Sequence, residues 1–175
     1  QKELNALLDE LRQIPNENEW IEFKVNNTNP EEVGKRISAL SNGACLLGKD
    51  FGFLVFGVED ETKVIKGTEK HIGEIKNGNE LLEHWIAQRL SPRVDFRVYD
   101  FDRGALKITI IQINAAFGVP TKFTNEAYIR VGSITRKLRE FPEKERKIWN
   151  SRHRELFEDK IAKRSVEATS IQSLL

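Results

Sequence analysis

The sequence has 175 residues, of which 39% are hydrophobic and 31% charged, proportions that exclude a wholly disordered chain and fit one folded domain. The single cysteine, Cys45, excludes a disulfide framework within the chain, and three histidines at unrelated positions argue against structural zinc. No apolar run approaches the roughly 18 residues of a membrane span, and no signal-peptide core is present, so we expect a cytoplasmic protein without membrane contact.

The net charge of +1 hides an uneven distribution along the chain. Residues 130–164 contain 12 Lys/Arg and 6 Asp/Glu, so the rest of the chain is acidic. A basic segment on an acidic body is typical of a phosphate-binding edge. The alternative is a solvated helix stabilised by ion pairs.

The first predicted elements are a helix and a strand. Leucines at helical spacing predict a helix over residues 2–13, which Pro15 ends. Apolar and polar residues alternate over 19–25, which predicts a strand. Because side chains alternate along a strand, Glu22 and Lys24 would share its polar face.

A longer helix and a buried strand follow. Asn29, Pro30 and the acids after them predict a helix start, and Gly48 is expected to end that helix. The near-continuous apolar run over 51–58 predicts a central strand covered on both faces. Asp60 would then lie in a charged turn close to the end of this strand.

The second half mixes strands and helices. Apolar periodicity predicts a helix over 79–90, and residues 93–101 and 105–113 read as a hairpin. A short strand is expected over 126–131, and a basic helix over 142–162.

This order of elements predicts an α+β fold, with a mixed or antiparallel sheet flanked by helices. We divide the chain into one domain over residues 1–140 and a basic C-terminal helix and tail over 141–175.

Two acids and a lysine near the first strand suggest phosphodiester chemistry. Glu22 can hold a divalent ion while Lys24 steadies attacking water or charge on a phosphate, and Glu17 could fold back to the same place. Asp60 could join them from the rigid end of the central strand. The alternatives are a surface ion pair and an ordinary turn aspartate.

A third candidate lies around the strand at 126–131. This strand contains Arg130, and Gly132 and Ser133 then turn the chain towards Arg136 and Lys137. Turn amides with flanking arginines can bind phosphate. The alternative is a strand with polar residues facing outwards. The sequence has neither a Walker-type phosphate loop nor a visible nucleophile–histidine–acid arrangement.

Three stretches, in order, carry a resemblance to a known family. They are Glu17-x-x-x-x-Glu22-Phe23-Lys24; Ile37-Ser38-Ala39-Leu40-Ser41-Asn42, then Gly52-Phe53-Leu54-Val55-Phe56-Gly57-Val58-Glu59-Asp60 and Val64-Ile65-Lys66-Gly67; and Ala127-Tyr128-Ile129-Arg130-Val131-Gly132-Ser133 with Thr135-Arg136. Across residues 15–140 the chain thereby resembles the Schlafen family in its prokaryotic form, the AlbA_2 domain. The resemblance implies a single Schlafen-like lobe.

The resemblance also implies a metal-dependent endoribonuclease that cleaves structured RNA such as tRNA. The metal-binding acids of such Schlafens fall on Glu17, Glu22 and Asp60, which would hold Mg²⁺ or Mn²⁺, and Lys24 matches the lysine expected to assist catalysis. The cations expected to bind the nucleic-acid backbone are Arg130, Arg136, Lys137 and Arg139.

The chain departs from the family pattern in two ways. Residues 41–50 form a longer connection without the paired glycines of many relatives, and the chain has one lobe where the vertebrate core has two lobes and a zinc site. We therefore expect a homodimer, which would build a comparable basic trough. Two alternatives to the nuclease stay open: a non-catalytic DNA- or RNA-binding module of a larger regulatory protein, and an assembly domain that oligomerises through the helix at 142–162.

Overall fold

The structure, a computed structural model, describes residues 1–15 and 18–152. The helices are α1 (Lys2–Arg12), α2 (Pro30–Leu46), α3 (Leu82–Ala87) and α4 (Pro142–Trp149), with 3₁₀ turns η1 (Ile72–Glu74) and η2 (Leu138–Glu140). The strands are β1 (Ile21–Lys24), β2 (Phe51–Phe56), β3 (Lys76–Asn77), β4 (Glu80–Leu81), β5 (Leu90–Ser91), β6 (Phe96–Arg103), β7 (Leu106–Asn114), β8 (Lys122–Phe123), β9 (Glu126–Val131) and β10 (Ile134–Lys137).

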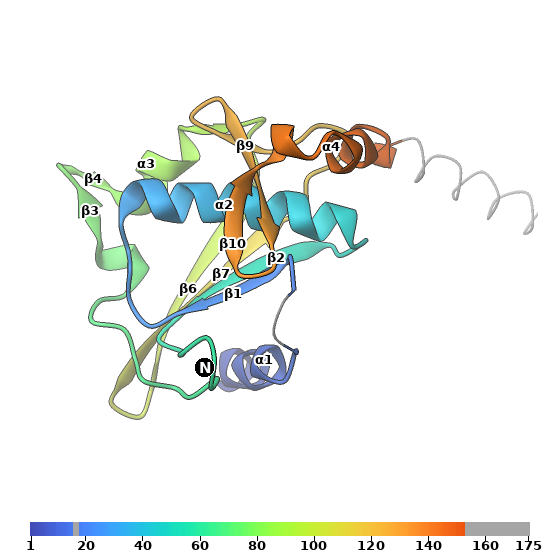
Figure 1. Ribbon diagram of the computed structural model, residues 1–175. Coiled ribbons are helices and arrows are strands. Elements are labelled where there is room, and N and C mark those ends of the chain that lie inside the picture. The colour runs from blue at the N-terminus through green and yellow to red at the C-terminus, as the bar shows by residue number, and fades with distance from the viewer. Residues whose placement is uncertain (16–17, 153–175) are drawn as a thin grey trace, which may run out of the picture.

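The main sheet has the strand order β1-β2-β7-β6 (Figure 1). β1 and β2 run parallel, with Glu22 opposite Leu54, whereas β2–β7 and β6–β7 are antiparallel. The parallel pair needs a crossover, and α2 supplies it. The sheet is therefore mixed and flanked by helices, and the predicted α+β fold is confirmed.

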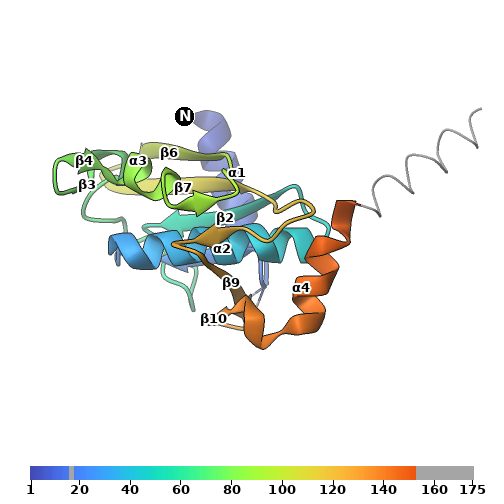
Figure 2. The ribbon, with the colours of Figure 1, turned by 90° about the horizontal axis from the view of Figure 1, so that it is seen from above.

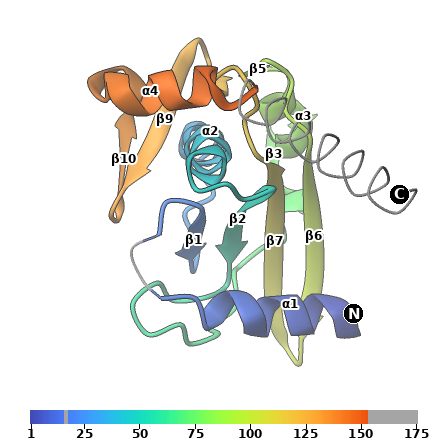
Figure 3. The same ribbon diagram turned by 90° about the vertical axis from the view of Figure 1, so that its right-hand side faces the viewer.

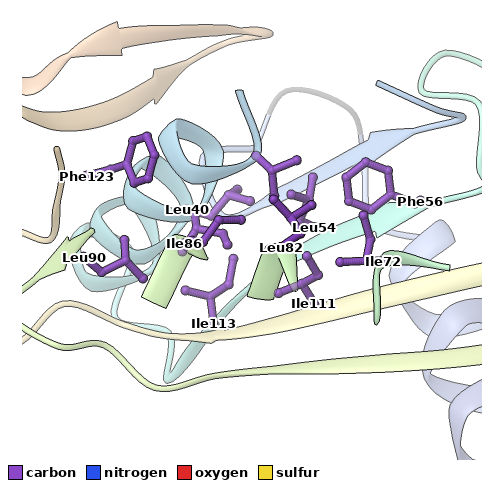
Figure 4. Packing of buried hydrophobic residues seen from close by; sticks show 12 residues of the cluster. Leu40, Leu54, Phe56, Ile72, Leu82, Ile86, Leu90, Ile111, Ile113 and Phe123 are labelled. Carbon is purple, nitrogen blue, oxygen red and sulfur yellow. The ribbon is translucent and has the colours of Figure 1, made fainter. Parts of the chain in front are cut away.

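Both faces of the main sheet are covered. Because side chains alternate along β2, Leu54 and Phe56 enter one apolar cluster while Phe53 and Val55 enter another. The first cluster packs under α2 and α3, as Figure 4 shows, and α1 crosses the opposite face (Figure 3). The predicted central strand, buried on both sides, is thus confirmed.

A second sheet, ordered β10-β9-β8-β5, lies on the other side of α2 from the main sheet (Figure 2). Buried polar groups of α2 hold it in place. Ser38 Oγ donates to Thr121 O at 2.7 Å, Asn42 Nδ2 donates to Tyr128 O at 2.8 Å, and Thr121 N donates to Asn42 Oδ1 at 2.8 Å. The Ser-Ala-Leu-Ser-Asn stretch is therefore a docking stripe that satisfies buried backbone groups of the second sheet.

The start and end of α2 follow the predicted signals. Asn29 Oδ1 accepts a hydrogen bond from Glu32 N at 3.2 Å, Pro30 is the first helical residue, and Gly48 follows the helix with a positive φ of 65°.

The helix predicted over 79–90 is shorter in the structure. α3 has only six residues, because the turn at Gly78, with φ 64°, pairs β3 with β4 and carries the chain into α3 from a hairpin. At the other end, Leu90 pairs with Phe123 in β5–β8. The apolar spacing correctly indicated a helix, but local pairing with β3 replaced its predicted start and pairing with distant β8 replaced its predicted end.

α4 packs against the second sheet. Ile148 is fully buried in a cluster with Ala127, Ile129 and Leu138. Beyond residue 152, the predicted helix over 142–162 lies outside the described residues, and the domain boundary at residue 140 stays a prediction.

Candidate functional site

Glu22 is the centre of the candidate site. It lies in β1, where Ile21 and Phe23 face the cluster under α1, so its side chain points to the α2 side of the sheet. Three cations surround its carboxylate. Lys24 Nζ lies 3.2 Å and Arg36 Nε 3.3 Å from Oε1, and Arg130 Nη1 lies 2.7 Å from Oε2.

We call Glu22, Lys24, Arg36 and Arg130 the Glu22 cluster. Glu22, Arg36 and Arg130 are 3%, 6% and 4% exposed, whereas the Lys24 side chain is 28% exposed. Arg130 Nη1 and Glu22 Oε2 lie 2.7 Å apart and neither atom has a hydrogen-bond partner among the described residues, so this contact is an ion pair. Glu22 therefore serves as the internal counter-ion of two buried guanidinium groups.

Each arginine of the cluster is also tied to a backbone carbonyl. Arg36 Nη1 donates to Asn27 O at 3.1 Å, in the loop after β1. Arg130 Nε donates to Gly132 O at 3.0 Å, in the turn between β9 and β10. The cluster thus joins β1, α2 and the β9–β10 hairpin, and the guanidinium of Arg130 is held from both ends.

Asp60 pairs with Lys63 in the turn after β2. Its Oδ1 is 3.0 Å from Lys63 Nζ, which in turn lies 4.4 Å from the centroid of the Phe23 ring. Phe23 faces the α1 side of the sheet, whereas Glu22 faces the α2 side. The Asp60–Lys63 pair therefore lies by the α1 side of β1, whereas the Glu22 carboxylate lies on the α2 side.

Charged and polar side chains within the turn that contains Asp60 stabilise its conformation. The hydrogen bonds that Lys66 and Thr62 donate to Glu59 lower the pKa of that exposed carboxyl. Lys63 contributes a second tie, since its backbone carbonyl accepts from Arg12 Nε at 2.8 Å.

The predicted metal site finds no ready donor set in this arrangement. Within residues 1–15 and 18–152, no group of three His, Cys, Asp or Glu side chains could hold a metal ion. Both oxygens of Glu22 face cations, and Asp60 faces Lys63. Glu17 lies outside the described residues, so the metal site formed by Glu17, Glu22 and Asp60 stays a prediction.

The other predicted phosphate ligands are on the surface. The side chains of Arg136, Lys137 and Arg139 are 51%, 44% and 66% exposed. Arg136 Nη2 lies 2.5 Å from Glu140 Oε2, whereas Lys137 and Arg139 lie 4.0 and 3.7 Å from Glu126. Surface pairs of this kind are worth about 0–1 kcal/mol, so these cations remain available to a polyanion.

The sequence around this site matches a known protein family. The family model described as Schlafen, AlbA_2 matches residues 17–139, which include the described members of the Glu22 cluster. The chain belongs to the Schlafen AlbA_2 family.

Two solved structures are similar to this Schlafen AlbA_2 chain. A crystal structure of the DIP2311 protein from Corynebacterium diphtheriae is 21% identical, with a TM-score of 0.46, over 78% of this chain and 26% of that one. A solution structure of the N-terminal domain of a RecG-related protein from Nitrosomonas europaea is 19% identical, with a TM-score of 0.42, over 63% of this chain and 72% of that one. No curated protein matches the sequence.

Arg36 is the member of the Glu22 cluster that lies outside the three Schlafen motif stretches and that sequence reasoning missed. It lies on the buried face of α2, three residues after Val33 and four before Leu40, and the sequence signals used for this helix were only those of its start and end. An arginine at a buried position of a helix requires an acid nearby, because an unpaired buried charge is costly. That rule would have linked Arg36 to the glutamate of the family motif.

A groove of about 550 Å³ lies next to the cluster in this Schlafen domain. The loops after the parallel strands β1 and β2 meet there, where Asn26 Oδ1 accepts from Thr68 Oγ1 at 3.1 Å and from Glu69 N at 3.0 Å. Asn27, whose carbonyl binds Arg36, lines the same groove. No helix in the described part of the chain is long and apolar enough to span a membrane.

Proposed function

We propose that this Schlafen AlbA_2 domain binds nucleic acid through its phosphate backbone, with Arg136, Lys137 and Arg139 as the main ligands. The observation that carries the proposal is the charge of one segment. Residues 126–140 contain four cations and two acids, and three of the cations are exposed on β10 and η2. Phosphate contacts by Lys and Arg give sequence-independent binding.

Arg130 has a different place in this proposal. Its side chain is 5% exposed and both ends of its guanidinium are engaged, so a phosphate would have to displace Glu22 or the Gly132 carbonyl. The Glu22 cluster therefore supports the binding surface from inside, and the exposed cations supply the phosphate contacts.

The test is the salt dependence of binding. We expect purified protein to bind labelled tRNA and a matched DNA hairpin, with an affinity that falls steeply as salt rises. The variant R136E/K137E is expected to weaken binding to both ligands and to reduce the slope of log K against log salt by about 2, one for each lost contact. The natural partner we favour is structured RNA.

A matched control carries the same charge change elsewhere. Lys2 and Arg97 are exposed, Lys2 in α1 and Arg97 in β6. Phe96 and Val98 pack in the cluster under α2 and α3, so Arg97 between them faces the other side of the sheet, which α1 crosses (Figure 3). The variant K2E/R97E is expected to keep the wild-type slope. Equal losses in the two variants would show that net charge, and not this surface, determines binding.

The second candidate function is metal-dependent cleavage of RNA, with Mg²⁺ or Mn²⁺ as cofactor. The family motif favours it, because Glu22 and Lys24 share one face of β1 with their charged atoms 3.2 Å apart, and Glu17 and Asp60 occupy the family's acid positions. We expect cleavage of tRNA, if the domain has this activity, to require the metal, to stop with EDTA and to be lost in E22Q/D60N. Binding without cleavage under all these conditions would leave the phosphate-binding function alone.

Assembly and location complete the proposal. We propose a homodimer, which would place two basic hairpins on one nucleic acid, and a cytoplasmic location, which a chain with one cysteine suits. Light scattering at several protein concentrations tests the dimer, and a monomer at all concentrations would contradict it.

A further inference from the structure

The turn of the β9–β10 hairpin presents an apolar surface next to the exposed cations. Val131 and Ile134 pair directly across the two strands, on either side of Gly132 and Ser133, and are 36% and 59% exposed. Paired residues lie on the same face of a hairpin, so the two side chains form one small apolar tip. An exposed β-branched pair at a turn has no role in the core.

The tip is held in one place. Gly132 has a φ of 58° and is the first residue of a two-residue turn, a conformation that glycine adopts without strain. Its carbonyl accepts the hydrogen bond from Arg130 Nε, and Arg130 is paired with buried Glu22 in β1. The hydrogen bond from Arg130 to Gly132 and the ion pair of Arg130 with Glu22 therefore fix the tip to the main sheet. The tip lies at the β1 edge of that sheet (Figure 3).

We propose that this tip contacts unpaired bases of the bound nucleic acid, and that Glu22 and Arg130 are positioning residues for it. The inference rests on the proposed phosphate-binding function. Charge decides the occupant: Arg136, Lys137 and Arg139 follow the tip on the same segment and favour a polyanion over an apolar protein surface.

The size of the tip decides the kind of nucleic acid. Two aliphatic side chains offer apolar contact but no hydrogen bonds. They can contact bases only where the bases are already unstacked or where unstacking them costs little free energy. The bases of a paired RNA stem lie in a deep, narrow groove, whereas those of loops, bulges and single strands are open. The domain is therefore expected to prefer ligands with unpaired bases.

The experiment compares two RNA ligands of equal length and charge, one a hairpin with a large unpaired loop and the other fully paired. Wild type is expected to bind the looped RNA about tenfold more tightly, which corresponds to burial of the exposed apolar part of the tip. V131S/I134S is expected to lose this preference while keeping the wild-type affinity for the paired RNA and the wild-type salt slope.

Two further variants separate contact from position. L106S changes an exposed residue, 38% exposed, beside the turn of the β6–β7 hairpin and is expected to keep the preference. R130K keeps a positive charge beside Glu22 but loses the Nε bond to Gly132, and is expected to lower the preference without reducing the salt slope. A preference for the looped RNA that R130K keeps would contradict the positioning role of Arg130.

The outcomes distinguish this inference from the proposed function. Salt-sensitive binding of both RNAs with no preference for the loop, or a preference that V131S/I134S keeps, would overturn the role of the tip and leave the phosphate-binding function standing. Absence of salt-sensitive binding to either RNA would overturn both.

Discussion

Replacement of Glu22 by glutamine is expected to destabilise the domain by about 3 kcal/mol. Glutamine keeps the size of the side chain but removes the charge that faces Lys24, Arg36 and Arg130 at 2.7–3.3 Å. Removal of one partner from a buried ion pair costs about 3–5 kcal/mol, because the other charge stays buried without compensation.

The lower end of that range follows from the remaining contacts. Arg36 keeps the Asn27 carbonyl and the more distant Glu32, at 3.9 Å, and Arg130 keeps the Gly132 carbonyl. A chain of this size loses roughly 2–4 °C in Tm per kcal/mol, so the expected decrease is about 6–12 °C.

Thermal and urea unfolding of the metal-free protein in EDTA measure this effect. The control is Asp60→Asn: the Asp60 side chain is 39% exposed and pairs with Lys63, and loss of such a pair is expected to cost less than about 1 kcal/mol. If Glu22 instead stood among converging carboxylates, its neutralisation would relieve repulsion and stabilise the metal-free protein. An unchanged or raised Tm for Glu22→Gln would therefore refute the counter-ion role.

Three further predictions concern stability. Ile148→Ala is expected to cost about 2–5 kcal/mol in urea unfolding, because Ile148 is fully buried, and a cost below about 1 kcal/mol would mean that α4 does not pack on the second sheet. Gly43→Ala is expected to lower the Tm clearly, since a Cβ there would lie 1.9 Å from the backbone oxygen of Glu19; a wild-type Tm would contradict this close approach. The hydrogen bond from Arg103 lowers the pKa of Asp9, so this stabilisation exists above the usual value of 3.8 and is lost as pH falls through the lowered pKa. Asp9→Asn should therefore flatten the acid side of the stability curve in a pH series of urea titrations, and an unchanged curve would count against the pair.

Local patterns in the sequence were enough to predict most elements of this Schlafen AlbA_2 domain. Alternation over 19–25 placed Glu22 and Lys24 on one face of β1, and the apolar run over 51–58 identified the central strand. The caps of α2 and the strand over 126–131 followed from short-range chemistry in the same way.

Contacts between distant elements were decided only by the tertiary structure. The predicted C-terminal end of the helix over 79–90 forms a strand instead, because Leu90 pairs with Phe123 more than thirty residues later. The surroundings of Glu22 come from α2 and β9, so no local pattern distinguished a carboxylate open to a metal from one enclosed by two arginines. The sequence by itself determined which way Glu22 and Lys24 face along β1, because side chains alternate along a strand. Only the packing of α2 and the β9–β10 hairpin over β1 decided which charges meet, because ion pairs depend on distances that the order of residues does not fix.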